Sequence, residues 1–336
     1  MSSDLKKFVL DFLKNTGLTS KPVEFKGFSG DGSDRSFWRI SLSQSGQYFI
    51  AMANPPVNRS IRQENLACLM IANHLRSKRI PVPEIYQYDL ENGWFIMEDL
   101  GQTSLQDLVS SKKNPLPDYE NVLEHLFRLQ IEGAKGFDPS WCCQTARYDR
   151  TVMRQNESNY FRDAFLFGYL GLKKEWPELE GPFDHLADIS SSADADFFIH
   201  RVFQSRNIII SAKGDIGIVD WQGGRFGPLG YDLASLINDP YTGLSHKQKN
   251  ELLQSYIRII KQYNAGWVES FKKTFIYLAI QRNLQILGAF SFLTIKKKKE
   301  RFEDYILPAQ KTLQELLEQA NDPRLSPIAD VLRARA

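Results

Sequence analysis

The stretch Phe197–Tyr231 reads FFIHRVFQSRNIIISAKGDIGIVDWQGGRFGPLGY, and it decides the interpretation of the whole chain. It contains Asn207, and Asp220 lies thirteen residues further on. The side-chain oxygens of an amide and a carboxylate suit Mg²⁺, a hard cation that keeps several of its own waters. Three short apolar runs predict strands around these residues: Phe197–Ile199, Asn207–Ile210 and Ile216–Val219. The stretch therefore predicts a magnesium site made by Asn207 and Asp220.

The residues before Asn207 match a loop that catalyses phosphoryl transfer. In that loop, H-R-D-x-x-x-x-N, the Asp accepts the proton of the attacking hydroxyl and the Asn holds Mg²⁺. This chain has His200, Arg201 and Val202 at the first three positions, and Asn207 stands at the last. Val202 is apolar, so it neither accepts a proton nor orients a hydroxyl. The pattern predicts an ATP- and Mg²⁺-dependent phosphotransferase with these four positions in its catalytic loop and with the usual base missing at Val202.

Three explanations of Val202 are open at this level. In the first, the chain is a pseudokinase that binds nucleotide as a sensor or scaffold, because a general base is worth typically 10²–10⁴-fold in rate. In the second, Val202 is an engineered or sequencing variant of an active enzyme. In the third, Gln204, or Asp220 through a water molecule, takes over the orientation of the hydroxyl.

Composition favours a globular protein with a small-molecule partner. The chain has 336 residues, of which 42% are hydrophobic and 24% charged, and this length predicts two lobes that each bury a core. The net charge is +2, so no strong field favours nucleic acid or an anionic membrane. The basic run Lys296–Lys299 is interpreted as a solvated helix end. Its alternative, a membrane-surface contact, predicts salt-sensitive binding to anionic vesicles.

The cysteines and the N-terminus favour a cytoplasmic protein. Cys68, Cys142 and Cys143 make an odd number without the spacing of metal ligands or of a disulfide framework, and they are interpreted as reduced. The first seventeen residues mix charged and apolar positions, which predicts a helix, capped by Ser3 and ended by Gly17, and not a signal peptide.

The order of predicted elements favours an α+β fold with two lobes. The expected strands before residue 100 are Val23–Phe28, Phe37–Leu42, Tyr48–Ala53, Glu84–Tyr88 and Trp94–Met97. A helix is expected over Arg62–Lys78, and helical periodicity dominates from Ser104 onward, including Arg147–Leu172. This order resembles a protein kinase. It predicts a small β-rich N-terminal lobe over 1–100, a hinge near 98–101, and a larger helical lobe over 101–336 with a catalytic and metal loop over 198–232.

The N-terminal lobe contains candidates for nucleotide binding. The backbone of Gly30, Asp31, Gly32 and Ser33 is predicted to contact the phosphates, although such a segment is also a common turn. The residues predicted to surround the adenine are Ile50, Met97, Glu98 and Leu100.

The phosphate-binding Lys that kinases carry on the third strand is missing. Met52 or Ala53 stands at its position, so Glu64 loses the partner expected for it. Arg35 or Arg39 is suggested to reach the phosphates instead.

The chain resembles the aminoglycoside phosphotransferase and choline kinase superfamily. The resemblance lies in FIHRVFQSRNIII, IVDWQGGRFGPLGYDLASL and QRNLQILGAF, and it covers nearly the whole sequence. Within the superfamily, the chain is most similar to bacterial kinases that phosphorylate N-acetylmuramate or N-acetylglucosamine at the anomeric hydroxyl during cell-wall recycling. The resemblance implies that Asp is usual at position 202 and Met on the third strand. It also implies an acceptor site near the loop, with Glu157, Asn238, Asp239, Tyr241 and Arg282 as candidate contacts.

Overall fold

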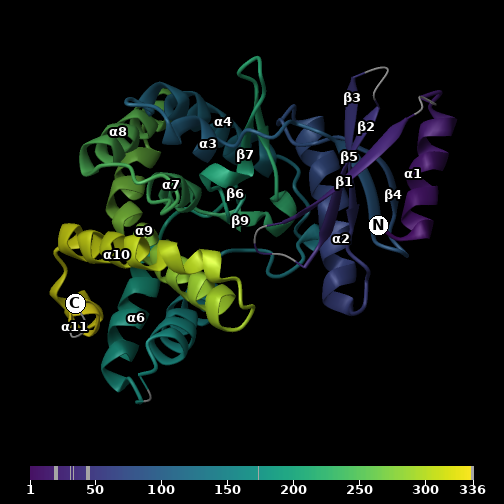
Figure 1. Ribbon diagram of the computed structural model, residues 1–336. Coiled ribbons are helices and arrows are strands. Elements are labelled where there is room, and N and C mark those ends of the chain that lie inside the picture. The colour runs from purple at the N-terminus through teal and green to yellow at the C-terminus, as the bar shows by residue number, and fades with distance from the viewer. Residues whose placement is uncertain (19–21, 31, 33, 43–45, 173, 334–336) are drawn as a thin grey trace. The chain divides into compact units, whose positions relative to one another are not determined.

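The computed structural model describes residues 1–18, 22–30, 32, 34–42, 46–172 and 174–333, which form two compact units (Figure 1). The first unit contains Met1–Thr103, Asp138–Gln144 and Ile208–Gly224. The second contains Ser104–Phe137, Thr145–Asn207 and Arg225–Ala336. The first is built on an antiparallel sheet and the second is mainly helical, so the predicted α+β, kinase-like class is confirmed.

The sheet of the first unit has five antiparallel strands in the order β1-β2-β3-β5-β4 (Figure 1). Their bounds are β1 Val23–Ser29, β2 Ser36–Leu42, β3 Gln47–Ala53, β4 Ile85–Asp89 and β5 Trp94–Glu98. Each predicted strand before residue 100 is present, with ends that differ by one residue at most. The prediction succeeded because turn residues separate these short runs along the chain.

Two helices pack with this sheet: α1 Ser3–Asn15 and α2 Arg59–Ser77. Val9, Phe12 and Leu13 of α1 form a core with Ile40 and Phe49 of the sheet. The predicted cap was wrong by one residue. The Ser2 side chain, and not that of Ser3, accepts the backbone N–H of Leu5, because the chain is still extended at Ser2.

Two later segments complete the first unit. A hairpin of β7 Ile208–Ile210 and β8 Ile216–Ile218 turns at Gly214, where φ is +86°. Its backbone N–H groups donate to earlier residues, from Ile210 to the Thr103 carbonyl and from Ile218 to the Pro81 carbonyl. The remaining elements are the short 3-10 turns η1 Pro139–Trp141 and η5 Trp221–Gly223.

The second unit is organised around α9, a 29-residue helix that buries residues on all its faces (Figure 1). Helices α6, α7, α8 and α10 pack against it. The helices of this unit are α3 Leu105–Ser110, α4 Leu116–Ala134, α5 Arg150–Met153, α6 Pro177–Ser191, α7 Leu229–Ile237, α8 His246–Tyr263, α9 Trp267–Ile295, α10 Ile306–Ala320 and α11 Ser326–Arg333. None of the helices in the described ranges has an apolar stretch long enough to cross a membrane.

Short elements connect these helices. A two-stranded sheet pairs β6 Phe197–Ile199 with β9 Arg225–Gly227, and the 3-10 turns are η4 Ser205–Asn207, η6 Glu300–Tyr305 and η7 Pro323–Leu325. Asn207 closes η4 instead of opening the next strand, because its backbone N–H donates to the Gln204 carbonyl. The predicted strand start at Asn207 was therefore one residue early.

The stretch predicted as helical over Arg147–Leu172 contains wide helical turns. After α5 the chain forms two π-helical segments, η2 Arg154–Ser158 and η3 Phe161–Tyr169. π-helical turns are rare and often occur at functional sites. Here η2 carries Glu157 into the interior of the unit, where it is 2% exposed.

Candidate functional site

The loop that follows β6 is fixed by Asp232 on α7. The backbone N–H of His200 donates to Asp232 Oδ2 at 2.6 Å, and that of Arg201 donates to Oδ1 at 2.8 Å. Arg201 has φ +78°, a left-handed conformation that is costly for a residue with a Cβ. The buried carboxylate therefore holds the loop in a conformation that the backbone alone disfavours.

Asn207 is oriented by the backbone of Val202. Asn207 Nδ2 donates to the Val202 carbonyl oxygen at 2.9 Å. Because the amide nitrogen is used in this way, Oδ1 is the atom of Asn207 suited to a cation. The structure thus brings together Val202 and Asn207, which the sequence placed in one loop.

Asp239 supports the middle of the same loop. It accepts the backbone N–H of Ser205 at 2.8 Å, the Ser205 hydroxyl at 2.6 Å and Gln204 Nε2 at 3.3 Å. Burial raises the pKa of Asp239, and these hydrogen bonds oppose the rise. Gln204, one of the groups suggested to orient a hydroxyl, is thus held by Asp239.

Asp220 lies in the first unit, at the turn before η5. Its φ is +69°, so the backbone is left-handed at this residue as well. Arg35 Nη2 lies 2.6 Å from Asp220 Oδ1, and Gln222 Nε2 donates to the same oxygen at 2.8 Å. The Trp221 indole N–H donates to the Cys68 carbonyl at 2.8 Å and fixes the turn. Sequence reasoning missed Gln222 and Trp221, although both stand directly after the predicted metal ligand.

The donor chemistry of Asn207 and Asp220 fits Mg²⁺. Magnesium keeps several waters and needs only one or two carboxylates from the protein. Within the described ranges, no group of three or more His, Cys, Asp or Glu side chains could hold a metal ion. The two predicted ligands belong to different units, Asn207 to the second and Asp220 to the first, and their sharing of one ion stays a prediction.

The predicted nucleotide residues lie in the first unit. Gly30 and Gly32 stand between β1 and β2, whereas Asp31 and Ser33 lie outside the described residues. Ile50 and Met97 are cross-strand partners of β3 and β5, so their side chains share one face of the sheet.

The last two residues predicted to contact adenine make internal contacts in the first unit. The backbone N–H of Glu98 donates to the Glu84 carbonyl at 2.8 Å, and the Glu98 carboxylate accepts the N–H of Glu84 at 3.1 Å. Leu100 packs so closely on Gly217 that a Cβ there would lie 2.5 Å from its Cδ1. Adenine binding by these residues stays a prediction.

Glu157, which the resemblance suggested as an acceptor contact, lies in a buried cluster of the second unit. Its carboxylate accepts the hydroxyls of Tyr148 and Tyr231, each at 2.5 Å. Burial raises the pKa of Glu157 to about 7, and the two tyrosine hydrogen bonds oppose the rise. Arg282, another suggested contact, is 3% exposed and donates from Nε to the Ser235 hydroxyl at 3.0 Å. In this structure both residues brace the helical unit.

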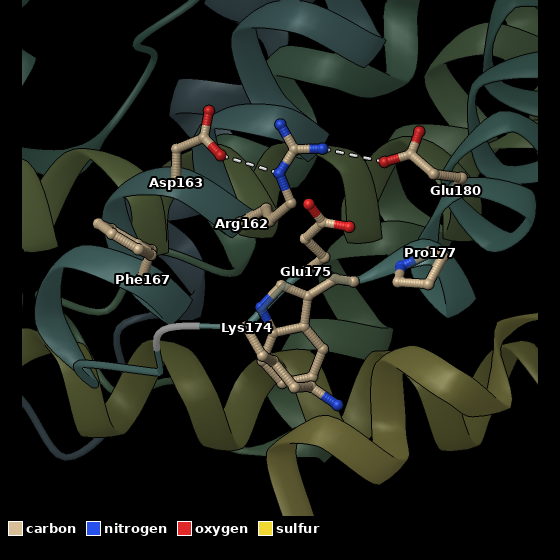
Figure 2. A pocket seen from close by; sticks show the side chains of 8 residues that line it. Arg162, Asp163, Phe167, Lys174, Glu175, Pro177 and Glu180 are labelled. Carbon is tan, nitrogen blue, oxygen red and sulfur yellow. Dashed lines mark hydrogen bonds and ion pairs between the residues drawn. The ribbon is translucent and has the colours of Figure 1, made fainter.

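A cavity of about 600 Å³ lies at η3 and the start of α6 (Figure 2). Its lining residues are Arg162, Asp163, Phe167, Lys174, Glu175, Trp176, Pro177 and Glu180. Figure 2 shows Arg162 between Asp163 and Glu180, with ion pairs of 2.8 and 2.9 Å. None of the residues predicted for catalysis or nucleotide binding lines this cavity.

The five-stranded sheet, the helical second unit and the loop between β6 and β7 define a protein of the kinase-like class. A family model described as "Phosphotransferase enzyme family" matches residues 24–267, and the chain belongs to this family. The resemblance inferred from the motifs is thereby confirmed.

The relatives in sequence carry one name. A protein of Pseudomonas aeruginosa named N-acetylmuramate/N-acetylglucosamine kinase is 27% identical over 283 residues, which cover 80% of this chain and 78% of that protein. A protein of Neisseria meningitidis with the same name is 24% identical over 83% of this chain and 81% of its own length.

Solved structures with the same fold are distant in sequence. An ethanolamine kinase of Plasmodium vivax has a TM-score of 0.65 at 13% identity, with 91% of this chain and 85% of that chain covered. An aminoglycoside phosphotransferase in a ternary complex with ADP and hygromycin B has a TM-score of 0.59 at 14% identity, with 94% and 98% covered. At such identities the likeness concerns the fold.

Proposed function

We propose that this chain is an ATP- and Mg²⁺-dependent phosphotransferase whose acceptor is a hydroxyl of an amino sugar of the N-acetylmuramate or N-acetylglucosamine class. The observation that carries the proposal is the shared name of four relatives, each aligned over more than three quarters of both chains. The anomeric hydroxyl is the proposed position, as the sequence resemblance implies.

In the proposed site, Asn207 Oδ1 and the Asp220 carboxylate would hold one Mg²⁺. When bound, the ion neutralises charge on the β- and γ-phosphates. The hydrogen bond from Asn207 to the Val202 carbonyl supports this role, because it fixes the amide with one oxygen left for the metal. Asp232 acts indirectly, as the residue that positions the loop.

Val202 determines how well the proposed reaction proceeds. In the transfer, the acceptor oxygen gains a bond to the γ-phosphorus in place of the bond to ADP, and the hydroxyl proton needs an acceptor. Val202 has no side-chain atom that accepts it, and the amide of Gln204 is not a base. We therefore propose that the site positions ATP and the acceptor correctly but transfers the phosphoryl group slowly.

Val202 also favours a second function, that of a pseudokinase. In this alternative the chain binds nucleotide as a sensor or scaffold and transfers no phosphate. The metal and nucleotide residues would be kept, and only the base would be absent.

The two functions are separated by measuring transfer from ATP to N-acetylmuramate and N-acetylglucosamine. Val202→Asp should raise kcat by about 10²- to 10⁴-fold, which is the usual contribution of a general base. Val202→Asn is the matched control, because it has the shape of Asp without a proton acceptor of comparable basicity, and it should not raise kcat. ATP binding with Mg²⁺ is measured in parallel by calorimetry.

Each outcome decides between the proposals. Turnover that rises with Asp and not with Asn supports the sugar kinase. Binding of ATP without turnover in any of the three proteins supports the pseudokinase. A chain that binds no ATP in the presence of Mg²⁺ contradicts both.

The proposed setting is the cytoplasm, where such a kinase would act in cell-wall recycling. Its support is the sequence resemblance, and the net charge of +2 favours neither nucleic acid nor a membrane surface as partner.

A further inference from the structure

Arg35 lies between two carboxylates of the first unit. Its Nη2 is 2.6 Å from Asp220 Oδ1, and its Nε is 3.8 Å from Glu64 Oε1. The Arg35 side chain is only 11% exposed, whereas those of Asp220 and Glu64 are 32% and 31% exposed. A buried guanidinium needs such partners to remain in the interior.

Arg35 directly precedes β2, at the edge of the sheet where β3 ends. In the β2–β3 register, Ser36 pairs with Ala53, the last residue of β3. A protein kinase carries its phosphate-binding Lys on that strand, paired with a Glu of the following helix. Here Glu64 is on α2, the helix that follows β3, and the cation paired with it is Arg35, the residue directly before β2.

Arg39, the other arginine suggested for the phosphates, is engaged elsewhere. It donates from Nε and Nη2 to the two oxygens of Asp99, the second bond being 2.8 Å long. Nη2 also donates to the Gly101 carbonyl at 2.9 Å. Arg39 thus fixes the chain after β5, and of these two arginines it is Arg35 that contacts Asp220.

The charges at Asp220 must rearrange when a divalent cation arrives. Two carboxylates now share one guanidinium, and a metal ion at Asp220 would supply the charge that Arg35 supplies at present. A guanidinium has five N–H donors in a planar fork that matches the oxygens of a phosphate. The released donors would lie close in sequence to Gly30 and Gly32, two residues of the predicted phosphate segment.

We propose that Arg35 is the phosphate-binding cation of this chain. Without nucleotide, Arg35 forms an ion pair with Asp220. When metal and nucleotide bind, its N–H donors turn to the triphosphate, while Nε stays beside the Glu64 carboxylate. This inference rests on the proposed function, because it requires a metal–nucleotide complex at the same site.

The proposal predicts two effects of opposite sign for Arg35→Met. The affinity for ATP with Mg²⁺ should fall by about 10- to 100-fold, the range expected for lost hydrogen bonds to a charged group. The affinity for Mn²⁺ alone should rise several-fold, because Arg35 no longer competes for Asp220. Calorimetry measures the first, and the electron paramagnetic resonance signal of free Mn²⁺ measures the second. A residue that only stabilised the fold would weaken both.

Arg39→Met is the matched control, since it removes an arginine only four residues further on, inside β2. It should leave the Mn²⁺ affinity unchanged. Arg35→Lys covers the case in which Arg35→Met does not fold. It keeps the charge, so Mn²⁺ binding should stay close to that of the wild type, and it loses the fork, so ATP binding should weaken several-fold.

The inference fails if ATP binds Arg35→Met or Arg35→Lys as tightly as wild type, or if Arg39→Met shows the opposite-signed pair of effects. Wild type that binds ATP while Arg35→Met binds it equally well overturns this inference alone. Wild type that binds no ATP overturns the proposed function together with it.

Discussion

Asp220 of the first unit and three buried carboxylates of the second unit are stabilised in different ways. In the first unit Asp220 is partly exposed and faces a cation, Arg35. In the second unit the hydrogen bonds to buried Glu157, Asp232 and Asp239 come from hydroxyl groups, backbone N–H groups and an amide.

The difference separates Asp220, the proposed metal ligand, from acids with a structural role. Burial raises the pKa of Glu157 and of Asp232 to about 7, since neutral donors offset only part of the cost of a buried charge. An acid held in this way is suited to bracing. Asp220 is partly exposed and faces Arg35, and we propose that it exchanges this cation for a metal.

Asp220→Asn gives the largest effect expected from this comparison. The affinity for ATP with Mg²⁺ should fall by about 100-fold or more, because a charged metal ligand is replaced by a neutral one. The unfolding transition in urea should shift only modestly, since Asn tolerates the left-handed backbone and its Oδ1 still accepts the hydrogen bond from Arg35. Calorimetry and urea titration test the two halves. A variant that unfolds readily but binds ATP normally would reverse the comparison.

Asp232→Ala should instead damage the fold. It leaves the buried backbone N–H groups of His200 and Arg201 without their acceptor, at a cost of about 2–5 kcal/mol in the free energy of unfolding. Asp232→Asn keeps one acceptor oxygen and should lose less. Urea titrations of the two variants and the wild type provide the measurement. Equal midpoints for all three would show that the loop does not need Asp232.

Glu157→Gln tests the raised pKa. Between about pH 4.5 and 7 the folded chain keeps a proton on Glu157 that the unfolded chain has lost, so this group makes the protein less stable as the pH rises through that window. Glutamine resembles the protonated form, and the variant should gain about 1–3 kcal/mol relative to wild type between pH 5 and pH 8. Urea titrations at four pH values test this. Parallel stability curves would contradict it.

Arg150→Ala should have the smallest effect. Arg150 pairs with Asp184 at 3.0 Å and Asp188 at 2.5 Å, but all three side chains are about half exposed. Exposed ion pairs contribute little because water and salt screen them. The melting temperature should equal that of wild type within error, and a clear decrease would show that charge pairing matters here without burial.

The sequence predicted helices and strands better than it predicted contacts between side chains. The strands before residue 100 follow from short runs bounded by turn residues, and Asn207 and Asp220 stand out by type and spacing, because these signals are local. The pairing of Arg35 with Asp220 joins residues 185 positions apart, for which a single sequence has no signal. The π-helical segment that buries Glu157 was also missed, because its residues have an ordinary helical pattern.

The first unit is built from three separate segments of the chain, and this affects how the chain can fold during synthesis. Residues 1–103 lack the β7–β8 hairpin, whose backbone donates to Pro81 and Thr103. At about 5–20 residues per second, a ribosome needs roughly 6–24 s to advance from residue 103 to residue 224. During that interval the carbonyls of Pro81 and Thr103 lack their hydrogen bonds to the hairpin. The helices encoded between residues 104 and 207 are therefore synthesised before the first unit is complete.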